Sequence, residues 1–187
     1  MPIHGRNPET RLLLSIACAG SLLTGCSSDK QTPPATRPSE LSAAALRSAT
    51  YRSPYVREAE VTLEHGVFRD TARRVGVFLQ PEYAVGDLDG DGWADAAVIL
   101  ASTTGGSGTF QDLAVVLNRR GVAVNEATFF LGDRVPADRV RIEGAEIHIQ
   151  LTMHGPADPM CCPTVETTRR FRLEGGEILE IEDPPGL

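Results

Sequence analysis

The distribution of apolar residues after position 50 most restricts what this chain can fold into, because it follows strand periodicity almost throughout. Polar and apolar residues alternate in three segments, residues 58–64, 147–151 and 164–173. Such alternation is typical of strands with one buried face. Residues 94–101 and 113–117 are instead continuous apolar runs, as expected for central strands that are covered on both faces.

Further extended segments, separated by turns, occur at residues 67–68, 74–79, 140–142 and 178–181, and residues 122–131 are expected to form a strand or mixed structure. Turns are expected at 65–66, 118–121, 144 and 175–176, where glycine is present. A short helix is expected over residues 41–49, with Ser39 or Ser42 as its N-cap. Seven or eight short strands after one early helix predict an α+β or mostly β fold, in which a single antiparallel-sheet domain carries one short N-terminal helix.

The amino terminus has the layout of a secretory signal. Arg6 and Arg11 precede an apolar run over residues 12–23, and small residues follow it. The run is shorter than the roughly 20 apolar residues that cross a bilayer core. The sequence at its exit is Leu23-Thr24-Gly25-Cys26, which resembles the lipobox of bacterial lipoproteins. A plain signal peptide with a chance cysteine, or a short buried helix, is the alternative interpretation.

The lipobox resemblance implies cleavage before Cys26, lipidation of its thiol and acylation of the new amino group, so that the chain becomes anchored in the cell envelope. Residues 26–39 are rich in proline and polar residues and are expected to form a flexible tether. Ser27 resembles the residue found in outer-membrane lipoproteins of Gram-negative bacteria, which implies an outer-membrane location facing the periplasm. The expected layout is a signal peptide at 1–25, a lipidated tether at 26–39, a globular domain at 40–183 and a tail at 184–187.

Composition limits the partners that this chain can have. Loss of Arg6, Glu9 and Arg11 with the leader changes the formal net charge from −7 to −8. An acidic surface of this kind argues against nucleic acid and against adsorption to anionic lipid. The expected membrane contact is therefore the lipid anchor alone, and the sequence indicates no particular protein partner.

The segment between residues 85 and 95 is the strongest metal-site candidate. Carboxylates occur at Asp87, Asp89, Asp91 and Asp95, and the carbonyl of Trp93 adds one more oxygen. Calcium prefers six to eight oxygen ligands from a flexible loop, and this spacing follows the first part of an EF-hand loop. The EF-hand interpretation is disfavoured, because its twelfth position is valine where glutamate is needed and a strand follows.

The same segment resembles the calcium loop of FG-GAP-type repeats, in which Asp-x-Asp-x-Asp-Gly-x-x-Asp links two strands. The resemblance implies calcium as a candidate cofactor, with Asp87, Asp89, Asp91, Trp93 and Asp95 as its ligands. It occurs once, whereas a β-propeller needs several copies, so the propeller fold is not implied. A metal-free turn is the alternative, since Asp-Gly pairs are common in turns.

Two further loops are unusual. Residues 103–109 form a glycine-rich loop that lacks the lysine of a phosphate-binding loop and is interpreted as a flexible hairpin connection. Residues 153–164 contain His154, three prolines and the adjacent pair Cys161-Cys162. A vicinal disulfide, reduced packed thiols, and a copper or redox site formed by the segment from Met153 to Cys162 are the alternatives for the cysteines.

These blocks together give the sequence-based hypothesis for function. The Asp-rich loop, the glycine loop and the His-Gly-Pro-x-Asp-Pro-x-Cys-Cys-Pro-Thr block resemble, in this order, a family of bacterial lipoproteins and exported proteins to which no activity is assigned. The resemblance would span residues 41–173 and implies a shared fold. The sequence therefore favours a non-enzymatic cell-envelope lipoprotein with a structural calcium loop. An exported hydrolase and a copper or redox protein are the alternatives, although His65, His148 and His154 lie in no recognisable catalytic motif.

Overall fold

The structure, a computed structural model, describes residues 41–159 and 161–182. The predicted leader, lipidated Cys26, tether and C-terminal tail lie outside the described residues. The domain boundaries at 40 and 183 therefore stay predictions.

The described chain is mostly β, with antiparallel sheets and one short helix, which confirms the expected fold class. Helix α1 spans Ala43–Leu46. The strands are β1 (Thr50–Arg52), β2 (Glu60–Thr62), β3 (Val67–Asp70), β4 (Val75–Gly86), β5 (Asp95–Thr103), β6 (Phe110–Arg119), β7 (Val122–Asp133), β8 (Ala137–Glu143), β9 (Glu146–Met153), β10 (Val165–Glu174) and β11 (Glu177–Ile181). These eleven strands exceed the seven or eight expected from the sequence.

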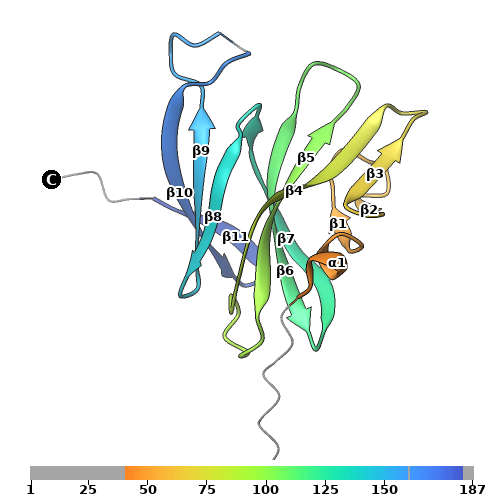
Figure 1. Cartoon of the computed structure of the whole chain (residues 1–187), viewed down its shortest axis with the longest axis vertical. Coiled ribbons are helices and arrows are strands. Elements are labelled where there is room, and N and C mark those ends of the chain that lie inside the picture. Colours follow the sequence, from red (N-terminus) through yellow and green to blue (C-terminus); the bar gives the residue numbers. More distant parts are fainter. Residues whose placement is uncertain (1–40, 160, 183–187) are drawn as a thin grey trace, which may run out of the picture. The chain divides into compact units, whose positions relative to one another are not determined.

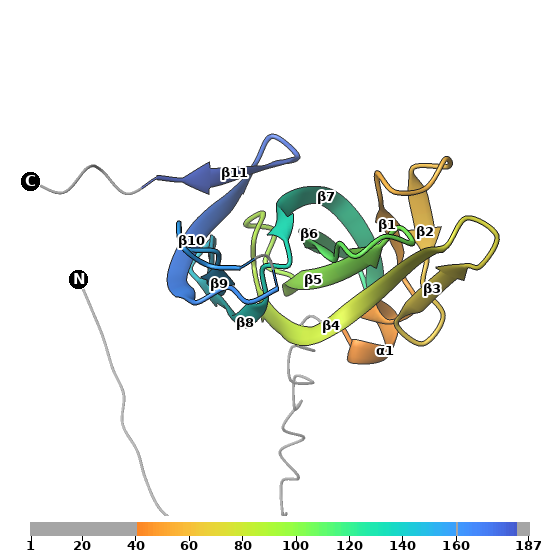
Figure 2. The ribbon, with the colours of Figure 1, turned by 90° about the horizontal axis from the view of Figure 1, so that it is seen from above.

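The strands form three sheets that pack as layers. The largest sheet has the order β3-β4-β5-β6-β7, the second has the order β11-β10-β9-β8, and β1 pairs with β2. The five-stranded sheet lies in the middle, with the four-stranded sheet against one face and α1, β1 and β2 against the other (Figures 1 and 2).

This layering explains why two segments are apolar at every position. In β5, Ala97 and Ile99 face the four-stranded sheet, whereas Ala96, Val98 and Leu100 face the α1 side. Strand β6 follows the same alternation, and all five of these β5 residues are almost completely buried. The two continuous apolar runs are central strands, as the sequence predicts.

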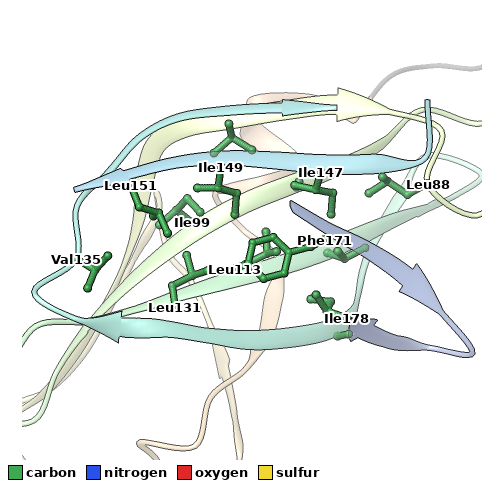
Figure 3. Close-up of a cluster of buried hydrophobic side chains, with 14 of the residues drawn as sticks. Leu88, Ile99, Leu113, Leu131, Val135, Ile147, Ile149, Leu151, Phe171 and Ile178 are labelled. Carbon is green, nitrogen blue, oxygen red and sulfur yellow. The ribbon is translucent and has the colours of Figure 1, made fainter. Parts of the chain in front are cut away.

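The main hydrophobic core fills the space between the five-stranded and four-stranded sheets (Figure 3). The four-stranded sheet contributes Ile147, Ile149 and Leu151 from β9 and Phe171 from β10, all with 0% exposure. These residues occupy alternate positions, so the other face of this sheet is free to carry polar side chains. Leu88, which lies within the acidic segment, belongs to the same cluster and is drawn at one end of it.

Strand β4 reaches from the α1 side to the four-stranded sheet and ends at the acidic loop. Its register with β5 shifts between Leu79 and Tyr83, around Pro81, which has no N–H for the ladder. At Gly86, a Cβ atom would lie 2.6 Å from Cγ2 of Ile142 in β8. Glycine is therefore needed where β4 passes β8, immediately before the loop begins.

Helix α1 is shorter than the expected span of 41–49. The Oγ atom of Ser42 accepts a hydrogen bond from the amide of Ala45 at 3.1 Å, so Ser42 is the N-cap. Its buried residue, Leu46, also accepts a hydrogen bond through its carbonyl from the hydroxyl of Tyr51. Within the residues described, no helix has the length and apolar character needed to cross a membrane.

Candidate metal centre

The acidic loop occupies residues 87–94, between the end of β4 and the start of β5. It is fixed at its beginning by Leu88, which is 3% exposed and packs in the core. The hydrophobic anchor places the flanking carboxylates at the end of the central sheet. Gly90 and Gly92 adopt φ values of 78° and 84°, a left-handed conformation that glycine adopts without strain.

Carboxylate oxygens fold the loop by accepting backbone amide hydrogen bonds. The two carboxylate oxygens of Asp87 accept from the amides of Gly90 and Gly92, at 2.7 Å and 3.1 Å. Asp89 accepts from the amide of Asp91 at 3.2 Å. The loop therefore curls around its own acidic side chains, as short polar side chains commonly do in turns.

Three of the predicted ligands come together. Asp87, Asp89 and Asp95 each offer a carboxylate oxygen, and these atoms all lie within 4.8 Å of one another. Such a group is able to hold a metal ion, since hard cations bind convergent carboxylate oxygens. Two carboxylates at this separation repel each other by on the order of 1–3 kcal/mol, depending on the local dielectric constant.

Asp91 and Trp93, the other two predicted ligands, are placed differently. Asp91 is not part of the convergent group; it accepts a hydrogen bond from the amide of Trp93 at 2.8 Å. Its other carboxylate oxygen lies 3.5 Å from Nη1 of Arg119. Trp93 thus enters the loop network through its amide, and its carbonyl as a ligand remains a prediction.

Asp95 is the buried member of the group and has a structural role of its own. Its side chain is 0% exposed, and its two oxygens accept from the amides of Leu88 and Asn118, both at 2.8 Å. Burial raises the pKa of Asp95, while these two amides oppose that change. The carboxylate therefore ties the loop to the end of β6 as well as facing the site.

Arg119 is the residue that sequence reasoning missed at this centre. Its Nη1 atom lies 2.8 Å from the carboxylate of Asp89, so it balances part of the loop's negative charge. Ala96 in β5 pairs with Val116 in β6, which brings the end of β6 beside the loop. Local sequence spacing does not indicate that Arg119 contacts Asp89, because these two residues lie 30 positions apart in the sequence.

The loop with the double cysteine lies elsewhere, between β9 and β10. Asp158 organises it by accepting hydrogen bonds from the amides of Gly155 and Thr164, each at 2.8 Å. The structure joins Cys161 to Cys162 as a vicinal disulfide, and both residues are exposed. Met160 lies outside the described residues.

Over the residues that the structure describes, the fold and this site define a layered antiparallel β domain with a convergent acidic loop. Comparison of the chain with protein-family models, curated proteins and solved structures found no match.

Proposed function

We propose that this chain is a non-enzymatic lipoprotein of the cell envelope, anchored through Cys26, whose acidic loop binds a structural calcium ion. The convergence of Asp87, Asp89 and Asp95 is the observation that carries the calcium proposal. Calcium fits this donor set better than magnesium, because it accepts irregular oxygen geometry and releases its water more readily.

The ligand atoms come from Asp95, at the start of β5, and from the loop itself. Each carboxylate oxygen of Asp95 accepts one amide and keeps a second lone pair for the ion. Asp91 reaches the ion once Arg119 withdraws, and the carbonyl of Trp93 completes the predicted set. Calcium and Arg119 therefore compete for the same negative charge.

A thermal melt of the purified chain tests calcium binding. Binding to the folded state alone adds RT ln(1 + [L]/Kd), which is about 1.4 kcal/mol at roughly ten times Kd. The melting midpoint should rise by several degrees in millimolar calcium compared with chelator, and less in magnesium. Asp89→Asn should remove most of this rise, whereas Asp138→Asn on β8, outside the loop, should keep it. An unchanged midpoint, together with no heat of calcium binding, would mean that the loop is only a turn.

The lipid anchor has an independent test. The Leu23-Thr24-Gly25-Cys26 sequence motivates it. A Cys26→Ser variant should stay unprocessed and take up no fatty-acid label in cells, while the wild-type chain is labelled. Equal labelling of the two chains would refute the anchor and leave the calcium proposal untouched.

The disulfide bears on the copper or redox alternative. While the sulfur atoms of Cys161 and Cys162 are bonded to each other, neither is a thiolate, which is the form that binds soft metals. Copper binding through this pair would first require its reduction. The arrangement therefore favours a structural role for the pair in an oxidising compartment.

A further inference from the structure

A pocket of about 750 Å³ lies along β7, the edge strand of the five-stranded sheet opposite β3. We call it the β7 pocket. Its walls come from the β1–β2 connection, from β6 and β7, and from the turn between β10 and β11. Its volume falls within the range of small-molecule sites, which is about 300–1,000 Å³.

Two buried polar side chains line this pocket. Ser53 is 4% exposed, and within the described chain its Oγ atom has no hydrogen-bond partner. Asp112, on β6, is 3% exposed. Burying a hydroxyl without a partner is unfavourable, but the Oγ atom of Ser53 has almost no accessible surface, so it is not a contact for a ligand in the pocket. Asp112 is therefore the buried side chain of the lining on which recognition depends.

The Asp112 carboxylate has a neutral partner. The phenol of Tyr55 donates a hydrogen bond to it, and Tyr55 in turn stacks on Phe110 with ring centroids 5.1 Å apart. Burial raises the pKa of Asp112 to about 6, and the Tyr55 hydrogen bond partly opposes this change. At neutral pH the pocket therefore contains a buried negative charge, and among the residues described no arginine, lysine or histidine forms an ion pair with it.

The remaining walls add negative charge and one apolar surface. Glu58, Glu60 and Glu177 line the pocket, against a single positive side chain, Arg52. Phe130, also in the lining, is 53% exposed, which is unusual for a ring of this size. A negative pocket with an accessible aromatic face attracts organic cations by charge and by the cation–π interaction.

We propose that the β7 pocket binds a small organic cation, an amine with an apolar or aromatic body. The ammonium group donates to the Asp112 carboxylate, and the apolar body lies on Phe130. No residue of the acidic loop lines the β7 pocket, so this site is separate from the candidate metal centre.

Calorimetric titration of the purified full chain with 2-phenylethylamine, in the presence of a chelator, tests the proposal. The matched neutral probe is 2-phenylethanol, which keeps the ring and loses the charge. We expect the amine to bind at least about tenfold more tightly than the alcohol, because only the amine forms a charge-assisted hydrogen bond to Asp112. Asp112→Asn should remove that preference, and Glu177→Gln should weaken amine binding by loss of one nearby negative charge. Asp138→Asn on β8 should change neither the amine affinity nor the alcohol affinity.

Several results would overturn the proposal. These are equal affinity for amine and alcohol, no binding of the amine up to about 20 mM, or unchanged amine binding in Asp112→Asn. If Asp112→Asn fails to fold, Glu177→Gln decides, and unchanged amine affinity in that variant refutes the site. Displacement of the amine by calcium or magnesium in the absence of chelator, lost in Asp112→Asn, would show an inorganic cation site instead.

Discussion

Replacing Asp95 with asparagine separates the structural role of this carboxylate from any role in binding calcium. Both oxygens of Asp95 accept backbone amides, from Leu88 and Asn118, and the side chain is fully buried. Asparagine has the same shape but places an NH₂ donor against one of these amide donors. Asp95→Asn therefore loses one charge-assisted hydrogen bond and leaves a buried N–H without an acceptor.

The expected magnitude follows from this geometry. A hydrogen bond to a charged group contributes about 1.5–3 kcal/mol. Part of that loss is offset, because burial raises the pKa of Asp95 and a neutral amide avoids the cost of desolvating a charge. We expect a net loss of roughly 1–3 kcal/mol, which lowers the melting midpoint by about 3–9 °C in a domain of this size.

The measurement is thermal unfolding followed by far-UV circular dichroism, in chelator and at neutral pH. The matched control is Asp91→Asn in the same loop, where the side chain is 35% exposed and lies outside the convergent group. Its free energy of unfolding should change by no more than about 0.5 kcal/mol. If Asp95→Asn melts together with wild type in chelator, the argument that this carboxylate holds the loop to β6 is wrong.

Three further predictions follow from individual side chains. Arg119→Gln should raise calcium affinity by up to about fivefold, because an exposed ion pair worth about 0.2–1 kcal/mol no longer competes with the ion; unchanged affinity would argue against competition. Burial raises the pKa of Asp112 to about 6 in the folded chain, whereas the pKa of this carboxyl has its ordinary value of 3.8 in the unfolded chain. Between pH 4 and 6 the folded chain therefore holds a proton that the unfolded chain has lost. Stability should therefore fall as pH rises through this window, by up to about 3 kcal/mol relative to Asp112→Asn, and parallel melting profiles of the two chains would contradict the assignment. Alkylation of the denatured chain without reductant should leave Cys161 and Cys162 unmodified, and two alkylated thiols would refute the disulfide.

Much of the secondary structure could be predicted because strand periodicity is a local property. The alternation at Ile147, Ile149 and Leu151 places these residues on one buried face, as the structure has them. The long apolar run in β5 indicates a strand covered on both sides, and the structure places such a strand in the middle of the largest sheet.

Two strand segments were missed for local reasons. Strand β1 has three residues, too few to show a period. Strand β4 continues beyond Pro81, where a proline normally ends a strand, because the register shift there removes the need for its N–H. The four carboxylates of the acidic segment, by contrast, stand within nine residues, and spacing alone indicates that Asp87, Asp89 and Asp95 lie close together. Asp91, which was expected with them, is not part of the convergent group.

The rest depended on contacts between distant parts of the chain. Arg119 contacts Asp89 only because β5 and β6 pair in one register, and that register cannot be predicted from the spacing of residues in the sequence. The β7 pocket likewise brings Ser53 and Asp112 together from segments about 60 residues apart. Local sequence determined the strands and the acidic loop of this protein, because periodicity and turn chemistry act over a few residues. Only the tertiary structure decided which charges face one another, because burial and pairing depend on how the three layers pack.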